Sequence, residues 1–247
     1  MKKETFRIKH PYAAVILLGL LCTFLTAVGM AIPQAMEFDT YMIYLISAIS
    51  LVFSSGLGIL IMKRTNITLS TYGFQRSENN NFRKIWWYTP LIIMEILPPA
   101  IYGFSNQILP YQYLIVAFFT IAVGFNEEIY FRGLILQFLT VKGRKQAITG
   151  SAIIFGVLHL ANAFNGKNLF YIILQMLFAF LVGFVLAEIV SITKSLWIVI
   201  IWHASHDFIA MTTEGELDTK ALIILSIQVL LLLMYAIGIW RKSTTKE

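Results

Sequence analysis

The stretch PYAAVILLGLLCTFLTAVGMAIP, residues 11–33, contains no charged side chain. A helix that crosses a bilayer needs about 20 mostly apolar residues, so this stretch predicts a membrane-spanning helix. It is too long for a secretory signal peptide and poor in the small residues of a cleavage site, so we expect it to be retained. Seven further apolar stretches predict about eight transmembrane helices in all, at residues 41–62, 85–104, 111–141, 147–163, 169–190, 195–212 and 220–240.

Composition favours the same fold class, an all-α polytopic membrane protein whose helices surround an intramembrane cavity. The 247 residues are 58% hydrophobic and 13% charged, whereas soluble domains carry about 25% charged residues. This excludes disordered, collagen-like, coiled-coil and disulfide-rich secreted proteins. The single cysteine, Cys22, cannot form an internal disulfide. We expect one membrane-embedded domain over residues 1–247.

The basic residues predict how the chain is oriented in the membrane. With the N-terminus in the cytoplasm, eight spans place 16 Lys and Arg residues on the cytoplasmic side and only Lys167 and Lys220 outside. Such a bias follows the positive-inside rule and puts both termini in the cytoplasm. The net charge of +6 therefore reflects orientation, and we expect the lipid bilayer, not nucleic acid, as a partner. The oligomeric state is not predicted.

Charged and imidazole side chains inside apolar spans are costly and mark functional sites by default. The predicted spans contain nine of them: Glu95, Glu127, Glu128, Arg132, His159, Glu188, His203, His206 and Asp207.

The densest group is the string NEEIYFRG, residues 126–133. Glu128 and Arg132 are four residues apart, so they can pair on one helix face. Glu127 points about 100° away from that face and is free to contact another group. Two adjacent acids with different neighbours should differ in proton affinity, which allows one of them to act as a base. The alternative is a surface ion pair at the end of a helix.

Two further strings supply imidazoles. In FGVLH, His159 lies one turn after Phe155, and in WHASHDF, His203 and Asp207 share a helix face. Together these groups favour peptide hydrolysis, with Glu127 taking a proton from water and His159 holding that water. His203 and a protonated Asp207 would donate hydrogen bonds to the oxyanion. Helix packing alone would also explain these polar residues.

Three other polar residues are less informative. Glu95 is close to Pro98 and Pro99, so we expect its helix to be kinked or broken and the acid to be structural. We expect Glu188 to lie at the membrane interface. His206 could either support the site or serve packing.

Signatures of other intramembrane chemistries are missing, including the HExxH zinc helix, GxSxG and GxGD. We expect no cofactor. A zinc site made by Glu127, His159 and His203 stays open, because three ligands with a vacant fourth position suit catalytic zinc.

The strings EExxxR, FxxxH and HxxxD, in this order, resemble the CPBP family, which includes the Rce1-like type II CAAX prenyl endopeptidases and the bacterial Abi proteins. The likeness covers approximately residues 110–210. It implies an intramembrane glutamate-dependent endopeptidase in a bacterial plasma membrane, acting on a peptide or membrane-protein substrate. It also implies that Glu127 and His159 activate water, that Glu128 and Arg132 support them, and that His203 and Asp207 form the oxyanion site.

One position departs from the family pattern. The prenyl-protease branch has asparagine where this chain has Asp207, which bears on CAAX-type cleavage more than on hydrolysis. Two other function classes stay open. The first is a non-catalytic membrane binding, immunity or regulatory protein of the same fold. The second is a proton-coupled transporter, although no inverted repeat is visible.

Overall fold

The computed structural model describes residues 6–78, 84–161, 169–213 and 219–244. Within these ranges the chain is helical and has no strand, which confirms the all-α class; one isolated β-bridge joins Phe104 and Thr213. The α-helices are α1 (Phe6–Lys9), α2 (Pro11–Ala35), α3 (Thr40–Lys63), α4 (Thr89–Tyr102), α5 (Pro110–Glu128), α6 (Leu136–Leu139), α7 (Arg144–Leu158), α8 (Leu169–Thr193), α9 (Trp197–Thr212) and α10 (Thr219–Thr244). The short turns are η2 (Ile85–Tyr88), the π-helical η3 (Ile129–Ile135) and η4 (Thr140–Lys142).

Each of the eight predicted spans contains a helix, but the number of spans that cross the membrane is not confirmed as eight. Five helical segments of the described chain are long and apolar enough to cross, and they begin at Pro11, Thr40, Pro110, Ile172 and Lys220. The helices α4, α7 and α9 have only 14, 15 and 16 residues. The chain is therefore a polytopic membrane protein that combines long and short helices.

The long helices begin at recognisable sequence signals. The side chain of Asp39 accepts hydrogen bonds from the backbone N–H groups of Tyr41 and Met42, which caps α3. At α5, Pro110 takes the first turn, and the side chain of Gln112 accepts a hydrogen bond from the N–H of Leu109. These caps fix where two of the long helices enter the bundle.

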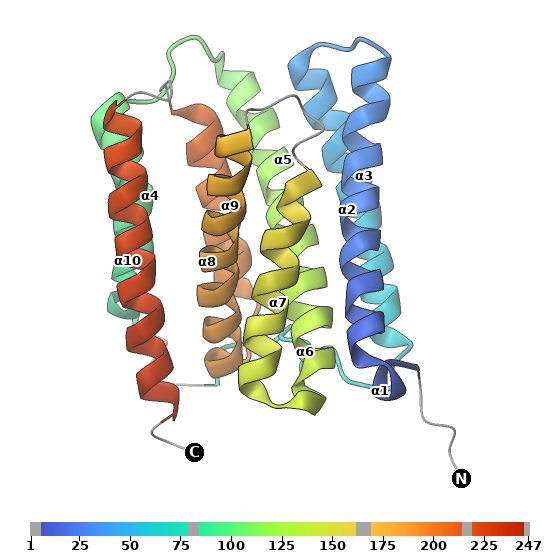
Figure 1. Cartoon of the computed structure of the whole chain (residues 1–247). Helices are drawn as coiled ribbons and strands as arrows, with labels where there is room; N and C mark the ends of the chain where they lie inside the picture. Colours follow the sequence, from blue (N-terminus) through green and yellow to red (C-terminus); the bar gives the residue numbers. More distant parts are fainter. Residues whose placement is uncertain (1–5, 79–83, 162–168, 214–218, 245–247) are drawn as a thin grey trace.

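The helices stand side by side, with α4 and α10 at one edge and α2 and α3 at the other (Figure 1). Helix α5 packs between α3 and α9. The approach of α5 to α9 is close at Gly124, where an added Cβ would lie 2.9 Å from the backbone nitrogen of Ala204. Because both candidate carboxylates lie just after Gly124, this contact brings the end of α5 against the middle of α9.

We expect Gly124→Ala to lower the free energy of unfolding by about 1–3 kcal/mol, because its methyl group meets backbone atoms that cannot move aside. Thermal unfolding in detergent measures the effect. Gly56→Ala is the matched control, since a Cβ there meets nothing within 4 Å, and alanine in a helix interior is favoured over glycine. Equal stability of the two variants would show that the close approach is unimportant.

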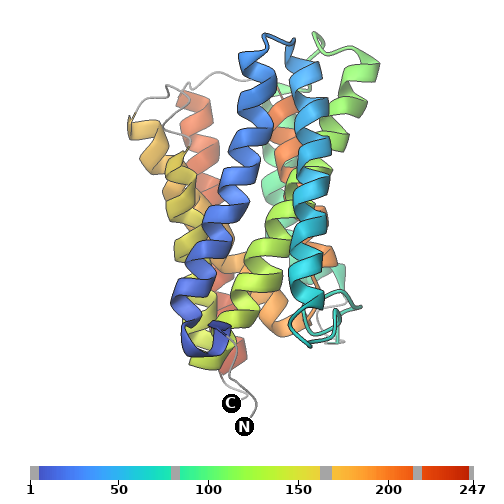
Figure 2. The ribbon, with the colours of Figure 1, turned by 90° about the vertical axis from the view of Figure 1, so that its right-hand side faces the viewer.

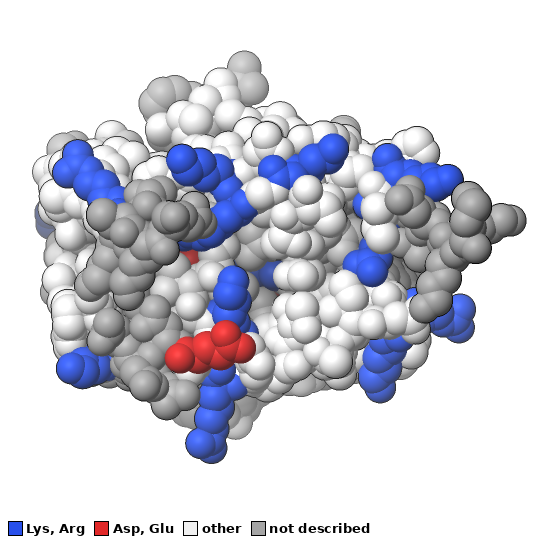
Figure 3. All heavy atoms as spheres, turned by 90° about the horizontal axis from the view of Figure 1, so that it is seen from below, with Lys and Arg blue, Asp and Glu red and all other residues white. Residues whose placement is uncertain are grey.

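Basic side chains gather at the lower end of the molecule, where α1 and the end of α3 lie (Figures 1 and 3). They come from several elements, namely Arg7 and Lys9 of α1, Lys63 and Arg64 at the end of α3, and Lys142, Arg144 and Lys145 around the turn before α7. The distribution agrees with the predicted bias, and the assignment of this face to the cytoplasm stays a prediction. Lys2, Lys3, Arg83, Lys167 and Lys246 lie outside the described residues.

Two sequence expectations concern α4 and α8. Helix α4 is not broken, since it continues through Pro98 and Pro99 to Tyr102. Glu188 is fully buried among the helices, on α8, and its position at the membrane interface stays a prediction. The sequence does not display tertiary packing, which decides both the surroundings of a polar residue and the course of a short helix.

Candidate functional site

The last turn of α5 brings three polar residues into the bundle. Asn126 and Glu128 are fully buried, whereas 18% of the Glu127 side chain is exposed. The side-chain amide of Asn126 donates a hydrogen bond to the Sγ atom of Cys22 on α2, over 3.4 Å. This contact links α5 to the first long helix and leaves the two neighbouring acids with different surroundings, as the sequence predicts.

Glu128 joins two elements that are far apart in the chain. Its Oε1 atom accepts a hydrogen bond from Arg132 NH1 over 2.9 Å and contacts Nδ1 of His203 on α9 over 2.7 Å. Because a carboxylate only accepts, Nδ1 of His203 carries the proton of this bond. All three side chains are buried. Glu128 therefore fixes the orientation of the His203 ring as well as pairing with Arg132.

The other ring nitrogen of His203 faces two further carboxylates. Nε2 lies 3.8 Å from Oε2 of Glu127 and 3.7 Å from Oδ2 of Asp207. These distances are too long for direct hydrogen bonds. Glu127 and Asp207 are the exposed members of the group, with 18% and 29% of their side chains accessible. A water molecule or a substrate oxygen can therefore bridge the three groups from the accessible side.

His159 lies just after the last residue of α7. Its Nδ1 atom is 2.8 Å from the carbonyl oxygen of Phe155, so Nδ1 is the donor of this bond and Nε2 remains available. The Phe155 ring meets the rings of His159 and His203 edge-on, with centroid distances of 4.6 and 6.2 Å. Glu127 and His159 are close enough to interact electrostatically. Phe155 thus contacts both imidazoles. The guanidinium group of Arg132 stacks on the same ring, 4.2 Å from its centroid.

The structure therefore brings Glu127, Glu128, Arg132, His203 and Asp207 together, with His159 beside them. The predicted pairing of Glu128 with Arg132 is present. The contact between Glu128 and His203 was not predicted, because the two residues are 75 positions apart and nothing in either string names its partner.

The backbone after the two acids is π-helical from Ile129 to Ile135, which the sequence analysis also missed. Short π-helical turns inside α-helices occur frequently at functional sites. Every residue of this segment is buried. The π-helical turn therefore lies inside the bundle.

A second acid–imidazole pair lies one turn further along α9. Nδ1 of His206 is 3.0 Å from Oε1 of Glu95 on α4, and the His206 ring stacks between Trp202 and Phe178. Glu95 also lines an apolar cavity of about 710 Å³ between α4 and α9. The structural role predicted for Glu95 therefore takes the form of a polar contact between two helices.

Removing the acceptor at Glu95 is expected to cost stability. For Glu95→Leu we expect a loss of about 1.5–3 kcal/mol, because the half-buried His206 loses a charged hydrogen-bond partner. Thermal unfolding in detergent provides the measurement. Glu95→Gln keeps an acceptor oxygen and serves as the control, which should lose less than the leucine variant. If both variants unfold like the wild type, the pair contributes nothing to the joining of α4 and α9.

The described residues do not form a metal site by proximity. No three His, Cys, Asp or Glu side chains among them are arranged so that they could hold one metal ion. Glu127, His159 and His203 are accordingly not such a group in this arrangement, and a zinc site made by them stays a prediction.

A comparison with protein-family models gives one match. Residues 109–209 match the family described as type II CAAX prenyl endopeptidase Rce1-like. Over these residues the chain is similar to that family, and residues 109–209 are called the Rce1-like domain below. No curated protein and no solved structure matches the chain significantly.

The Rce1-like domain begins at the residue before α5 and ends within α9, so it contains all three strings and the whole cluster around His203. At the level of the family, the match indicates an intramembrane protease and therefore a protein substrate. Helices α2, α3, α4 and α10 lie outside the Rce1-like domain. Through Glu95, helix α4 of the remaining chain makes a polar contact with His206 of α9.

Proposed function

We propose that this protein is an intramembrane endopeptidase that uses Glu127 as general base and hydrolyses a peptide or membrane-protein substrate. The observation that carries the proposal is the position of His203. Its ring is oriented through Nδ1 by the buried Glu128, while Nε2 faces the accessible carboxylates of Glu127 and Asp207. One carboxylate orients this imidazole, and two others face it across a gap that a water molecule can bridge. This arrangement suits the activation of a bound water.

In the first step, Glu127 accepts a proton from water as the water oxygen attacks the carbonyl carbon of the peptide bond. A positioned general base contributes about 10²–10⁴-fold to such a reaction. The Nε2 atom of His159 accepts a hydrogen bond from the hydrogen that stays on the water oxygen, because Nδ1 is engaged by the Phe155 carbonyl. Glu127 then returns the proton to the leaving nitrogen as the carbon–nitrogen bond breaks.

The negative charge that develops on the carbonyl oxygen needs hydrogen-bond donors in a site with little water. With a proton on each nitrogen, His203 donates to Glu128 through Nδ1 and to the oxyanion through Nε2. Asp207, 3.7 Å from Nε2, adds a second donor when its carboxyl group is protonated. Arg132 offsets the charge of the buried Glu128, so the orientation of His203 is maintained.

This mechanism requires no metal ion, since the base, the water-holding group and the oxyanion donors are all side chains of the chain. We place the protein in the plasma membrane of a bacterium, with the basic lower face of Figure 3 and both termini in the cytoplasm. A peptide segment that lies in the membrane suits a site whose surroundings are helices of apolar composition.

The test is a comparison of membrane peptides from cells that express the wild type or Glu127→Gln. Mass spectrometry of new peptide ends should reveal fragments that occur only with the wild type, and these identify both reaction and substrate. If no fragment depends on Glu127, the endopeptidase proposal fails. If cellular function also survives Glu127→Gln but is lost when leucine substitutions fill the cavity between α4 and α9, the protein is a binding or regulatory protein.

A second arm tests the metal-free mechanism. The purified protein is assayed on an identified substrate with and without a chelator. We expect unchanged activity. Loss of activity that zinc restores would contradict the proposed chemistry while leaving the endopeptidase assignment intact.

A further inference from the structure

A groove unrelated to the candidate site runs between α2 and α3 near their lower ends. It has a volume of about 630 Å³. In Figure 2 these two helices lie side by side, with the chain around α6 behind them towards the lower end. Leucines of both helices and one phenylalanine of α6 form the walls and floor, namely Leu17, Leu18, Leu21, Leu57, Leu60 and Phe138. None of the candidate site residues lines this groove.

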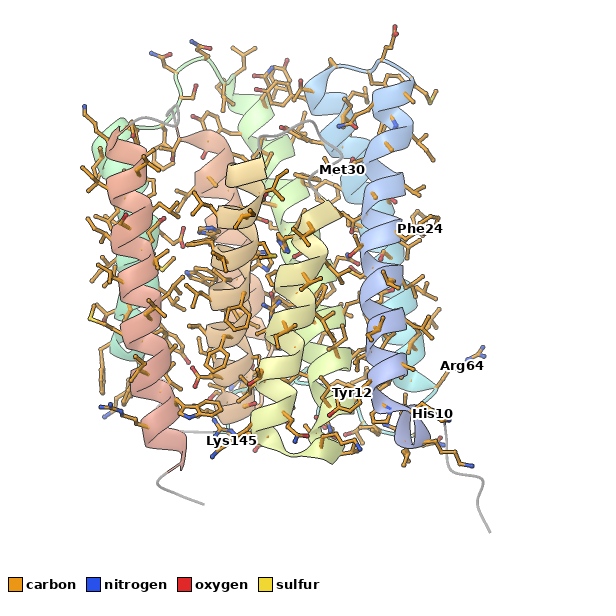
Figure 4. The ribbon with its side chains drawn as sticks, viewed as in Figure 1. His10, Tyr12, Phe24, Met30, Arg64 and Lys145 are labelled. Atoms are coloured by element: carbon orange, nitrogen blue, oxygen red, sulfur yellow. The ribbon has the colours of Figure 1, made fainter. Side chains whose placement is uncertain are left out.

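The lower mouth of the groove is basic. Arg7 of α1 and Arg64, just after the end of α3, both line it. Arg7 donates one hydrogen bond to the carbonyl oxygen of Thr65 over 3.3 Å, and its guanidinium group lies 5.4 Å from the centroid of the Phe138 ring. Its Nε atom is buried and has no hydrogen-bond partner among the described residues. The stick view labels Arg64 at the lower end of α3, on the same level as His10 (Figure 4).

The charges at this mouth are not neutralised within the described part of the chain. No acidic side chain there forms an ion pair with Arg7 or Arg64. The helix faces beside the groove are made for lipid, since 64% of Phe24 and 57% of Leu60 are exposed. The apolar walls of the groove suit an acyl chain, and the two unpaired arginines at its end suit a phosphate. An anionic phospholipid contains both groups.

We propose that this groove binds one anionic phospholipid, with an acyl chain along the leucines of α2 and α3 and the phosphate between Arg7 and Arg64. Guanidinium groups bind phosphate oxygens through charge-assisted, often paired hydrogen bonds, and Arg7 has donors for them because it makes only one hydrogen bond among the described residues, to Thr65. The lipid is a resident ligand that fills the space between α2, α3 and α6. A peptide is less well suited, because the walls are almost entirely apolar side chains and offer few partners for backbone hydrogen bonds.

The experiment uses the full chain purified in a mild detergent and titrated with phosphatidylglycerol or phosphatidylcholine that carry identical acyl chains. Native mass spectrometry counts bound lipid. We expect phosphatidylglycerol to bind roughly 25-fold more tightly, because each basic residue near an anionic headgroup contributes about fivefold. The variant Arg7→Gln/Arg64→Gln should lose this preference. Lys63→Gln is the matched control, since Lys63 is exposed beside Arg64 but does not line the groove, and it should keep the preference.

A second pair of variants tests the apolar part without touching the charges. Leu17→Trp places a bulky side chain in the groove, whereas Leu20→Trp places it at a similarly exposed position of the same helix that does not line the groove. We expect only Leu17→Trp to weaken phosphatidylglycerol binding, by about tenfold or more.

Three binding results would overturn the proposal. They are equal binding of the two lipids by the wild type, equal losses in Leu17→Trp and Leu20→Trp, and binding of glycerol phosphate as tight as that of the intact lipid. The last result would indicate a simple phosphate site. A dimer in place of a lipid adduct would indicate that a second copy of the chain covers the groove.

Discussion

Glu127→Gln is expected to reduce the rate of peptide cleavage by about 10²–10⁴-fold while the protein remains folded. The amide has nearly the size of the carboxylate but cannot accept the proton of water. It also leaves the buried contacts of Glu128 intact, since Arg132 and His203 both bind the other acid. The rate constant for cleavage of an identified substrate by the purified variant gives the size of the effect.

Glu188→Gln is the matched control for Glu127→Gln, because it removes another in-span carboxylate that lies on α8 and is fully buried. Its cleavage rate should stay within about a factor of three of the wild type, since Glu188 makes no hydrogen bond or ion pair with the candidate site residues among the described contacts. A Glu127→Gln enzyme that keeps more than a tenth of its activity would assign the base to another residue, and Asp207 would then be examined first.

Arg132→Met is expected to lower the free energy of unfolding by about 3–5 kcal/mol, because removing one member of a buried pair leaves the other charge without its partner. The Arg132 side chain is fully buried, donates to Glu128 over 2.9 Å and stacks on the ring of Phe155. The unfolding midpoint in detergent, converted to a free energy, measures the loss.

The double variant Arg132→Met/Glu128→Gln separates the ion pair from simple packing. If the pair is the cause, removing the second charge restores at least about 1 kcal/mol of the loss, which is within the usual range of coupling between contacting residues. Lys63→Met exchanges an exposed basic residue in the same way and should change stability by less than about 0.5 kcal/mol. Strictly additive losses would show that Arg132 acts through its contact with Phe155 alone.

The positions of the helices could be predicted from the sequence, because apolar runs and the placement of basic residues report directly on what the bilayer accepts. The stretch at residues 11–33 lies within α2, and residues 41–62 lie within α3. Helix length was less predictable at α7, where apolar residues continue to Leu160 although the helix ends at Leu158. An apolar residue after the end of a helix contributes to the hydropathy of the stretch as much as one inside it.

The candidate site could be predicted only in part. Spacing along one helix shows that Glu128 faces Arg132 and that Glu127 does not, because the geometry of a single helix fixes both. Contacts between helices lack such a rule. The bond from His203 to Glu128 and the bond from His206 to Glu95 span 75 and 111 residues. Which of two adjacent acids meets an imidazole depends on the rotation of α9 against α5, and the close contact at Gly124 sets how nearly the two helices approach.

The short helices have a consequence for the surrounding lipid. At about 1.5 Å per residue, the 14 residues of α4 and the 16 residues of α9 extend about 21 and 24 Å, while a hydrocarbon core is about 30 Å thick. Lipids that contact α4 must thin to match it, at a cost that grows with each ångström of mismatch, although α10 beside it has 26 residues. The bilayer should therefore be depressed locally beside α4, where headgroups and water sink towards α9 and shorten the path by which a polar reactant arrives.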